Sequence, residues 1–454
     1  MTAKRHGYRL AAALLAVLLL IVSAVPVGAE ALRYEFPETE EEKITAPSAM
    51  MLYIGMQPEQ DVVLYEKEAD VRYQPGSLMR VAMIGYAMKL IKEQNIDMHT
   101  ATASYSLTLF NHYVAGTGLH VALMNFGETW TLHDLLTLCT IQTAADCAVT
   151  LAEKLSGSPE AFVDGLNQFA AELGCKDSHF TNVIGLNEEG QYMSARDTVT
   201  FTRYAMQYPE LVEMLELKDW TVKPISGGSR RSWPNSNDMI RPSTSSFYTY
   251  AEGGRTGGTL NETSLVEYGS LDGYDYMAVI MGAPRKDDKG NALNTAYAEA
   301  RLLIRWGLIG FDYETLLHKS EPVGRVAVSG CAERQHVSLV PAEDLNSVVI
   351  KNTDLSRITR QVTYTKESYT APIEKGEVLG RVTLQIDGKD VASANLVAGE
   401  AAPRNELYVI WTNICSFIFS GWTLALLIIV AALAIAYLWL MVRYNKNKKS
   451  KKRR

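Results

Sequence analysis

Cysteine is scarce in this chain of 454 residues, and its spacing is unlike that of a metal site. No two cysteines are separated by the two residues that zinc-binding pairs usually have, which argues against a zinc site. So few thiols also argue against a disulfide framework and favour small buried apolar side chains, although a bond between Cys139 and Cys147 stays open. The five are Cys139, Cys147, Cys175, Cys331 and Cys415.

Positive charge is in short supply between the two ends of the chain. The whole chain carries a net charge of −7, and leaving out the three cations of the first nine residues and the eight of the last twelve takes residues 10–442 to −18. An acidic outer portion argues against nucleic acid as a partner, because phosphates would be repelled. It leaves a small peptide open as a ligand.

A short apolar run lies near the N-terminus. Lys4, Arg5 and Arg9 precede the apolar residues 10–22, and Val27-Gly28-Ala29 follows them. A basic segment, an apolar run and small residues in this order are typical of a secretory signal peptide. We therefore expect residues 1–29 to be removed on export, with cleavage after Ala29.

A second apolar run lies near the C-terminus. Thr423 to Val442 is an unbroken run of 20 apolar residues, long enough to cross a bilayer core of about 30 Å. The eight cations of residues 443–454 follow directly, and positive flanks stay on the cytoplasmic side. The pattern predicts a single-pass protein of the cell membrane with its folded part on the extracytoplasmic side, and it makes the cytoplasmic membrane a partner.

The chain between these ends divides by composition. Residues 30–45 are acidic and predict a linker, and residues 404–422 are a juxtamembrane segment. Residues 46–316 begin with two strands, continue with helices, and end with a strand meander and a helix, which predicts an α+β fold with an antiparallel sheet flanked by helices. The expected strands are 48–54, 62–66, 247–250, 265–268 and 274–281, and the expected helices are 77–94, 131–140, 144–155, 160–173, 195–207 and 292–309.

Residues 317–403 have a different pattern. Short alternating apolar and polar runs recur, for example at 325–328, 337–340 and 381–385, and Asp387-Gly388 is a hairpin turn signal. Alternation with period two is typical of half-buried strands. This part of the chain therefore predicts a small all-β sandwich.

The most informative short segment is Pro75-Gly76-Ser77-Leu78-Met79-Arg80. A serine in the first turn of a helix and a residue three positions later share one face. With a neutral lysine at the later position, such a pair can activate the serine for attack on an acyl carbon. Here Arg80 stands at that position, so this segment alone favours an ordinary helix start with a surface arginine.

Two further segments follow Ser77 in an order that matters. Thr143-Ala144-Ala145 and Arg255-Thr256-Gly257-Gly258 stand where the S-x-N and K-T-G motifs of penicillin-binding proteins would be. Their flanks add to the match. The chain resembles a membrane-anchored D-alanyl-D-alanine carboxypeptidase of the low-molecular-weight penicillin-binding protein type, from about Ala46 to the C-terminus. The further matching segments are 182–186, 194–197, 235–237, 280–284 and 371–380.

The resemblance implies acyl transfer at the D-Ala-D-Ala end of a peptidoglycan stem peptide, with β-lactams as alternative ligands and without a metal or a cofactor. Ser77 would be the nucleophile. Arg80 stands where the general base should be, Thr143 where a serine relays the proton, and Ala145 where an asparagine holds the substrate amide. The resemblance also implies the penicillin-binding-protein fold, with a small β domain and a membrane helix after it.

At the third motif, Arg255 stands for the lysine that attracts the substrate carboxylate, and Thr256 and Gly257 complete the motif. The backbone N–H groups of Ser77 and Gly258 would form the oxyanion hole. An arginine binds a carboxylate at least as well as a lysine does, so the change at Arg255 is mild.

The changes at Arg80 and Ala145 are severe. Arginine is effectively never deprotonated, so it cannot accept the serine proton, and alanine has neither donor nor acceptor. His112 and His120 are alternative bases in a loop, whereas Lys89 is about three helical turns from the serine, which is too far. Three hypotheses remain: a pocket that binds without turnover, an active enzyme with a rearranged base, and a non-catalytic membrane-anchored scaffold.

Overall fold

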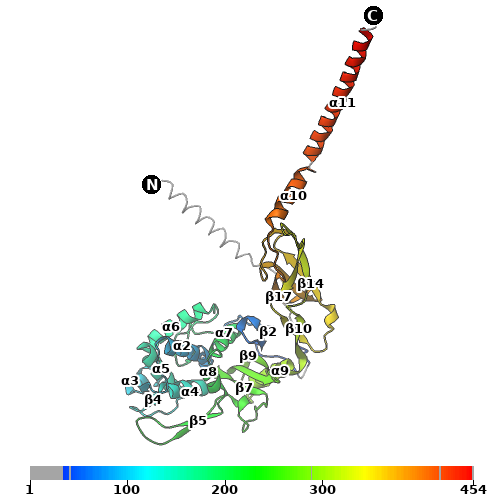
Figure 1. The fold of residues 1–454 in the computed structure, drawn as a ribbon. Coiled ribbons are helices and arrows are strands. Elements are labelled where there is room, and N and C mark those ends of the chain that lie inside the picture. The colour runs from blue at the N-terminus through cyan, green and yellow to red at the C-terminus, as the bar shows by residue number, and fades with distance from the viewer. Residues whose placement is uncertain (1–33, 40–41, 288, 419–420, 452–454) are drawn as a thin grey trace, which may run out of the picture. The chain divides into compact units, whose positions relative to one another are not determined.

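The computed structural model of the chain describes residues 34–39, 42–287, 289–418 and 421–451. The larger of two compact units holds the described residues of Arg33–Asp312 together with Val348–Thr353, and the smaller holds those of Tyr313–Ser347 and Asp354–Arg454. Figure 1 shows the helices and strands of both. The predicted signal peptide, residues 1–29, lies outside the described residues.

The larger unit is built on a five-stranded antiparallel sheet with strand order β2-β1-β9-β8-β7. The N-terminal hairpin thus pairs with a meander that comes some two hundred residues later in the chain, and the sheet confirms the predicted fold class. Asp272 and Gly273, the turn between β8 and β9, both have positive φ, as a tight hairpin requires. The strands are β1 Ser48–Ile54, β2 Val62–Lys67, β7 Ala251–Gly258, β8 Glu262–Leu271 and β9 Tyr274–Pro284.

Helices cover both faces of this sheet (Figure 1). One face packs on a helical core around α2, which is buried on almost every side, and α9 covers the other face. Thr131, Ser158 and Ser194 cap their helices, each accepting a backbone N–H three residues on. The helices are α2 Arg80–Glu93, α4 Leu132–Ile141, α5 Ala145–Ser156, α6 Pro159–Glu172, α7 Ala195–Ala205, α8 Pro209–Glu216 and α9 Thr295–Gly310.

Short elements connect these helices. Two small hairpins pair β3 with β4 and β5 with β6. The remaining short elements are the turns η1 Pro58–Gln60, η2 Gly76–Met79 and η4 Asp238–Ile240, helix α3 Leu107–Leu109, the π-helical turn η3 Phe110–Val114, and strands β3 Thr102–Ser104, β4 Thr129–Thr131, β5 Asp219–Val222 and β6 Arg231–Pro234.

Three features of this unit differ from the sequence analysis. The predicted strand at 247–250 is wrong, because the strand begins at Ala251 and contains the third motif itself. Helix α8 was not predicted; it begins at Pro209, where the missing N–H of proline is not needed. The segment expected to be a linker is packed: the ring of Tyr34 contacts Phe311, and its hydroxyl donates to the Val348 carbonyl.

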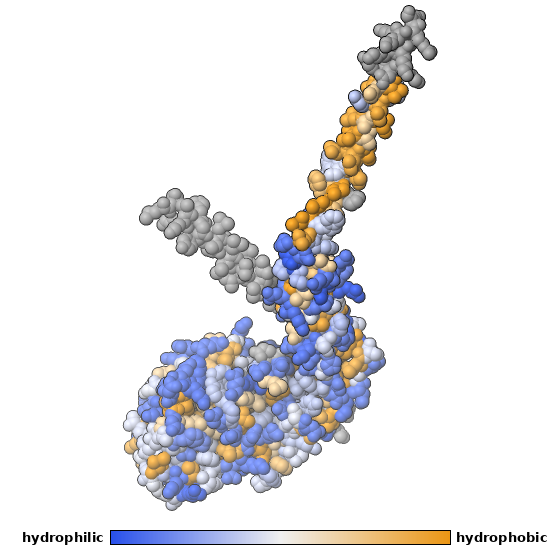
Figure 2. Space-filling model, in the orientation of Figure 1, coloured by the Kyte–Doolittle hydropathy of each residue, from blue (hydrophilic) through white to orange (hydrophobic). Residues whose placement is uncertain are grey.

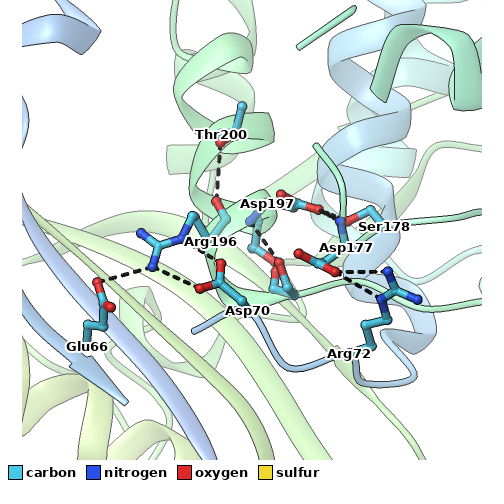
Figure 3. Close-up of polar contacts among 10 residues, drawn as sticks. Glu66, Asp70, Arg72, Asp177, Ser178, Arg196, Asp197 and Thr200 are labelled. Atoms are coloured by element: carbon cyan, nitrogen blue, oxygen red, sulfur yellow. Dashed lines mark hydrogen bonds and ion pairs between the residues drawn. The ribbon is translucent and has the colours of Figure 1, made fainter. Parts of the chain in front are cut away.

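An ion-pair network fixes the segment that leads to the first motif (Figure 3). At the start of α7, the Arg196 guanidinium pairs with Asp70 at 2.6 Å and with Glu66 at 3.2 Å. The backbone N–H of Arg196 also donates to the Ala69 carbonyl. The end of β2 and the chain after it are therefore held against the first turn of α7.

Asp197 extends the network inward. Its carboxylate is buried and accepts the backbone N–H of Asp177 at 2.9 Å and the Ser178 hydroxyl at 2.8 Å. Asp177 in turn pairs with Arg72 at 3.0 Å, as Figure 3 shows. The segment 66–72 is thus bonded to neighbouring elements through Glu66, Asp70 and Arg72, shortly before the chain reaches Ser77.

The smaller unit contains a six-stranded sheet with order β14-β16-β17-β12-β11-β15 and its own apolar core. Asp387 and Gly388 have positive φ and form the predicted turn, but β17 after it was not predicted. The strands are β11 Gly324–Ser329, β12 His336–Pro341, β14 Thr359–Tyr364, β15 Ser368–Thr370, β16 Val378–Ile386 and β17 Lys389–Ala398; β10 Phe311–Leu317, β13 Leu345–Ile350 and the turn η5 Leu355–Arg357 complete the list.

The chain ends in two helices, α10 Glu406–Ile418 and α11 Gly421–Lys451. The part of α11 from Gly421 to Arg443 has 23 residues and a mean hydropathy of 2.8, and none of it is buried. It is long and apolar enough to cross a membrane, and Figure 2 shows apolar surface along it. This helix contains the predicted span of residues 423–442.

Candidate active site

Ser77 lies in the short turn η2 that precedes α2. The turn is sharp because Gly76 has a φ of +53°, and a Cβ atom added there would lie 1.9 Å from the Gly258 carbonyl oxygen. The Ser77 side chain is half-buried, and its hydroxyl donates to the Thr256 carbonyl at 3.3 Å. The first and third motifs therefore meet, as the sequence predicted, but the serine hydroxyl contacts main chain and not a base.

Arg80 is fully buried, unlike the surface arginine of the simpler hypothesis. One terminal nitrogen donates to the Ala144 carbonyl, and the other donates to the Ile184 carbonyl at 3.0 Å. Burial lowers the pKa of Arg80, while Cys139 and its other acidic neighbours oppose that shift. Both ends of the guanidinium thus serve as hydrogen-bond donors that join α2 to two loops.

The second motif lies between α4 and α5. Thr143 is half-buried in the connection, and Ala145 is the first residue of α5 and fully buried. The backbone N–H of Ala145 donates to the His120 carbonyl at 2.9 Å. The structure therefore brings all three motifs together, although this one contributes no side chain of the kind that could hold a substrate amide.

Arg255 in β7 is the second buried arginine of the site, with 1% of its surface exposed. Its terminal nitrogens donate to the carbonyls of Thr140 and Gln142, the latter at 2.8 Å. Burial and the neighbouring Arg80 lower the pKa of Arg255 to about 9. No carboxylate is paired with either arginine among the described residues, so main-chain carbonyls are their hydrogen-bond partners.

The end of β7 corrects the expected oxyanion hole. The backbone N–H of Gly258 donates to the Pro75 carbonyl at 3.0 Å and is therefore not directed at a substrate. A Cβ atom on Gly257 would lie 2.1 Å from the Leu78 amide nitrogen, so the strand lies directly against the turn that carries Ser77. Thr256 is buried, and its hydroxyl lies 3.4 Å from the Ser236 carbonyl.

Asn187 is a residue of the site that the sequence analysis missed. Its side-chain oxygen accepts the Gly76 N–H at 2.9 Å, and its side-chain nitrogen donates to the Gly258 carbonyl at 3.3 Å. One amide therefore clamps the nucleophile turn to the end of β7. Its position directly after the 182–186 landmark was the only signal that could have identified it.

The alternative bases lie away from this centre or are solvated. Lys89 pairs with Glu93 and Glu172 on the surface of α2. His112 and His120 are both exposed. Among the residues that the structure describes, no group of three or more His, Cys, Asp or Glu side chains could hold a metal ion. All five cysteines are free, and four of them are buried, as their scarcity predicted.

The chain is similar to proteins of a known family. The sequence profile of the D-alanyl-D-alanine carboxypeptidase family matches residues 37–285, which is more than half of the chain. The chain belongs to the D-alanyl-D-alanine carboxypeptidase family. The profile of the penicillin-binding protein 5 C-terminal domain matches residues 311–404, which contain the six-stranded sheet.

Curated relatives cover most of the chain. D-alanyl-D-alanine carboxypeptidase DacF of Bacillus subtilis is 24% identical over 74% of this chain and 82% of its own length. The carboxypeptidase DacC of Escherichia coli is 27% identical over 79% of this chain and 86% of its own length. These identities support the family without assigning a role to any of the substituted residues.

Solved structures show the same fold. Penicillin-binding protein 5 from Haemophilus influenzae matches with a TM-score of 0.64 and 24% identity, over 81% of this chain and all of that one. A peptidoglycan synthesis regulatory factor (PBP3) from Streptococcus pneumoniae matches with a TM-score of 0.60 and 19% identity, over 79% of this chain and all of that one. These solved structures therefore share the fold of this chain.

Proposed function

We propose that this protein is a membrane-anchored member of the carboxypeptidase family that binds D-Ala-D-Ala-ended stem peptides, and β-lactams, without useful turnover. The observation that carries the proposal is the environment of Arg80. Its side chain, which stands where the resemblance puts the general base, is fully buried and donates both terminal nitrogens to main-chain carbonyls. A serine hydroxyl is a weak nucleophile unless a neighbouring group accepts its proton.

The protonation state of the two arginines supports this proposal. The pKa of Arg255, lowered to about 9, still leaves its guanidinium charged at neutral pH. Burial lowers the pKa of Arg80. The usual pKa of arginine is so high that the side chain keeps its proton in proteins. Neither arginine can act as a general base. General-base catalysis typically contributes about 10²–10⁴-fold to the rate.

Ligand binding requires a change at the end of β7. The Arg255 guanidinium and the Gly258 N–H, which family relationships would direct at a substrate, are already donating to protein carbonyls. A stem peptide must replace these internal partners, so we expect its affinity to be weak. Arg255→Ala should lose most of that affinity, because the peptide carboxylate would then face no cation.

The alternative proposal is an active carboxypeptidase with a rearranged base. It is favoured by the retained hydroxyl of Ser77, which is half-buried and lies beside Thr256. For turnover, the turn η2 that carries Ser77 would have to open and bring the serine within reach of a base, because this arrangement supplies none.

The experiment compares binding with turnover on one ligand. The purified chain is mixed with a peptide that ends in D-Ala-D-Ala, and binding is measured by calorimetry while released D-Ala is measured separately. Weak binding without release supports the proposal, and Arg255→Ala serves as the variant that should not bind. Release of D-Ala that depends on Ser77 would establish the active alternative, and absence of binding would leave a scaffold.

A further inference from the structure

A cavity of about 180 Å³ lies in the larger unit, lined by residues that do not include Ser77 or Arg255. Its walls come from three separate parts of the chain: the π-helical turn η3, the first turns of α6, and the loop 181–184. π-Helical turns are rare and often occur at functional sites. The lining residues are Tyr113, Pro159, Glu160, Val163, Thr181, Asn182, Val183 and Ile184.

The floor and the rim of this cavity differ in chemistry. Pro159, Val163, Val183 and Ile184 are buried, and they give the floor an apolar character. Glu160 is exposed at the rim. None of the eight lining residues is a lysine or an arginine, so an aliphatic chain fits the floor while the rim favours a cation.

Glu160 is the carboxylate of the rim, and a second carboxylate is bonded to two of the lining residues. Glu160 accepts the Tyr113 hydroxyl at 2.7 Å, which together with nearby His112 holds the pKa of that carboxyl below its usual range. Glu188, which does not line the cavity, accepts the Thr181 hydroxyl at 2.6 Å and also an Asn182 side-chain N–H. The hydroxyl and amide groups of the lining residues are therefore already bonded to acids.

We propose that this cavity binds an aliphatic chain that ends in an ammonium group, with the methylene groups on the apolar floor and the ammonium beside Glu160. A lysine-type side chain of a peptide and a free alkylamine share this chemistry. Long amine side chains commonly bury their methylene stem while the charged head stays near water, which matches a cavity that opens at a carboxylate. The inference does not depend on the state of Ser77, because none of the lining residues belongs to the three motifs.

The test uses the full chain in detergent micelles and NMR of the methyl groups of Val163, Val183 and Ile184. Three probes are titrated: N-acetyl-lysine amide, its side-chain-acetylated form, which has no charge, and 1-aminopentane. The two amines should shift these methyl resonances saturably, whereas the neutral probe should bind several-fold more weakly. The ranking of the two amines shows whether a peptide-borne or a free amine is preferred.

Two variants separate charge at the rim from charge elsewhere. Glu160→Gln keeps the shape of the rim and should weaken both amines by about threefold to fivefold, the upper part of the range expected for an exposed ion pair. Asp164→Asn, which removes an exposed carboxylate on the same helix but not at the cavity, should leave their affinity unchanged. Equal binding of the neutral probe, or undiminished binding by Glu160→Gln, would overturn the proposal, as would methyl resonances that no probe shifts.

Discussion

At the scale of single residues, Arg80 and Arg255 both serve as hydrogen-bond donors to main-chain carbonyls. Arg80 joins α2 to the Ala144 and Ile184 carbonyls, and Arg255 joins β7 to those of Thr140 and Gln142. A guanidinium presents several N–H groups in a fixed plane, so it can serve two carbonyls at once, whereas an ammonium is a compact charge. Each arginine also raises the cost of burying the other, because both are cations in a low-dielectric core.

Glu267 on β8 leads to a prediction about pH. Its side chain is fully buried, and one carboxyl oxygen accepts an N–H from Asn237 while the other has no partner among the described residues. Burial raises the pKa of this carboxyl well above its usual value. In the unfolded chain it ionises from about pH 4.3, so the folded state loses stability as pH rises from there towards the raised pKa.

Glu267→Gln should therefore remove part of this pH dependence and raise the unfolding temperature at pH 8 more than at pH 5. Thermal unfolding of the full chain in detergent, followed by circular dichroism at both values, measures the difference. Glu189→Gln, at an exposed position, is the matched control and should behave like the unaltered chain. A variant that is stabilised equally at both pH values would show that Glu267 is not protonated in the folded state.

At the scale of secondary-structure elements, helices with caps were predictable and the motif strand was not. The predicted ranges 131–140 and 195–207 lie within one or two residues of the observed bounds of α4 and α7, whose caps are Thr131 and Ser194. Strand β7 reads Ala-Glu-Gly-Gly-Arg-Thr-Gly-Gly, which has little β propensity, and it forms because β8 pairs with it along its length. Tertiary pairing overrides local preference there, and that is why the prediction chose the aromatic segment just before it.

Prediction of the site from the sequence was limited in the same way. The order of the motifs predicted which segments meet, because those segments carry recognisable residues. Contacts of backbone groups, such as Gly258 N–H with the Pro75 carbonyl, depend on a displacement of a few ångströms that no residue pattern encodes. The clamp formed by Asn187 was missed for the same reason, since an asparagine after a glycine-containing landmark is common in loops.

Two carboxylates at the start of α7 lead to a prediction at the scale of this element. Asp197 belongs to the helix and Asp70 pairs with its Arg196, and the two lie in different environments (Figure 3). Asp197 is buried and accepts two hydrogen bonds from the loop 177–178, whereas the side chain of Asp70 is 61% exposed. Asp197→Ala should cost roughly 1–3 kcal/mol, because it leaves buried donors without a partner. Asp70→Ala should cost at most about 1 kcal/mol, as is typical of exposed ion pairs.

Thermal unfolding gives the ranking of these two variants, and hydrogen exchange of the Asp177 backbone amide, which donates to Asp197, locates the effect. Faster exchange at this amide in Asp197→Ala but not in Asp70→Ala is the expected pattern. Equal destabilisation by the two substitutions would mean that burial does not distinguish the two carboxylates.

At the scale of the whole molecule, the C-terminal part of the chain predicts a topology. The helix segment Gly421–Arg443 is long and apolar enough to cross a membrane, and the lysines and arginines after it are expected to stay on the cytoplasmic side. Protease added to intact protoplasts should therefore remove all of the chain before Thr423 and leave only a short membrane-protected fragment. Cells opened with detergent are the control, and survival of the six-stranded domain in intact protoplasts would refute this topology.

The central claim is that Ser77 has no group to accept its proton, and acylation by a fluorescent penicillin tests it most directly. The unaltered chain should label no faster than Ser77→Ala, whereas Arg80→Lys combined with Ala145→Asn should label readily. Neither single change should suffice, because base and substrate clamp act as a unit and such effects are strongly non-additive. Unfolding temperatures confirm that each variant is folded. Labelling of the unaltered chain at the rate of the double variant would contradict the account, because a different base would then serve Ser77.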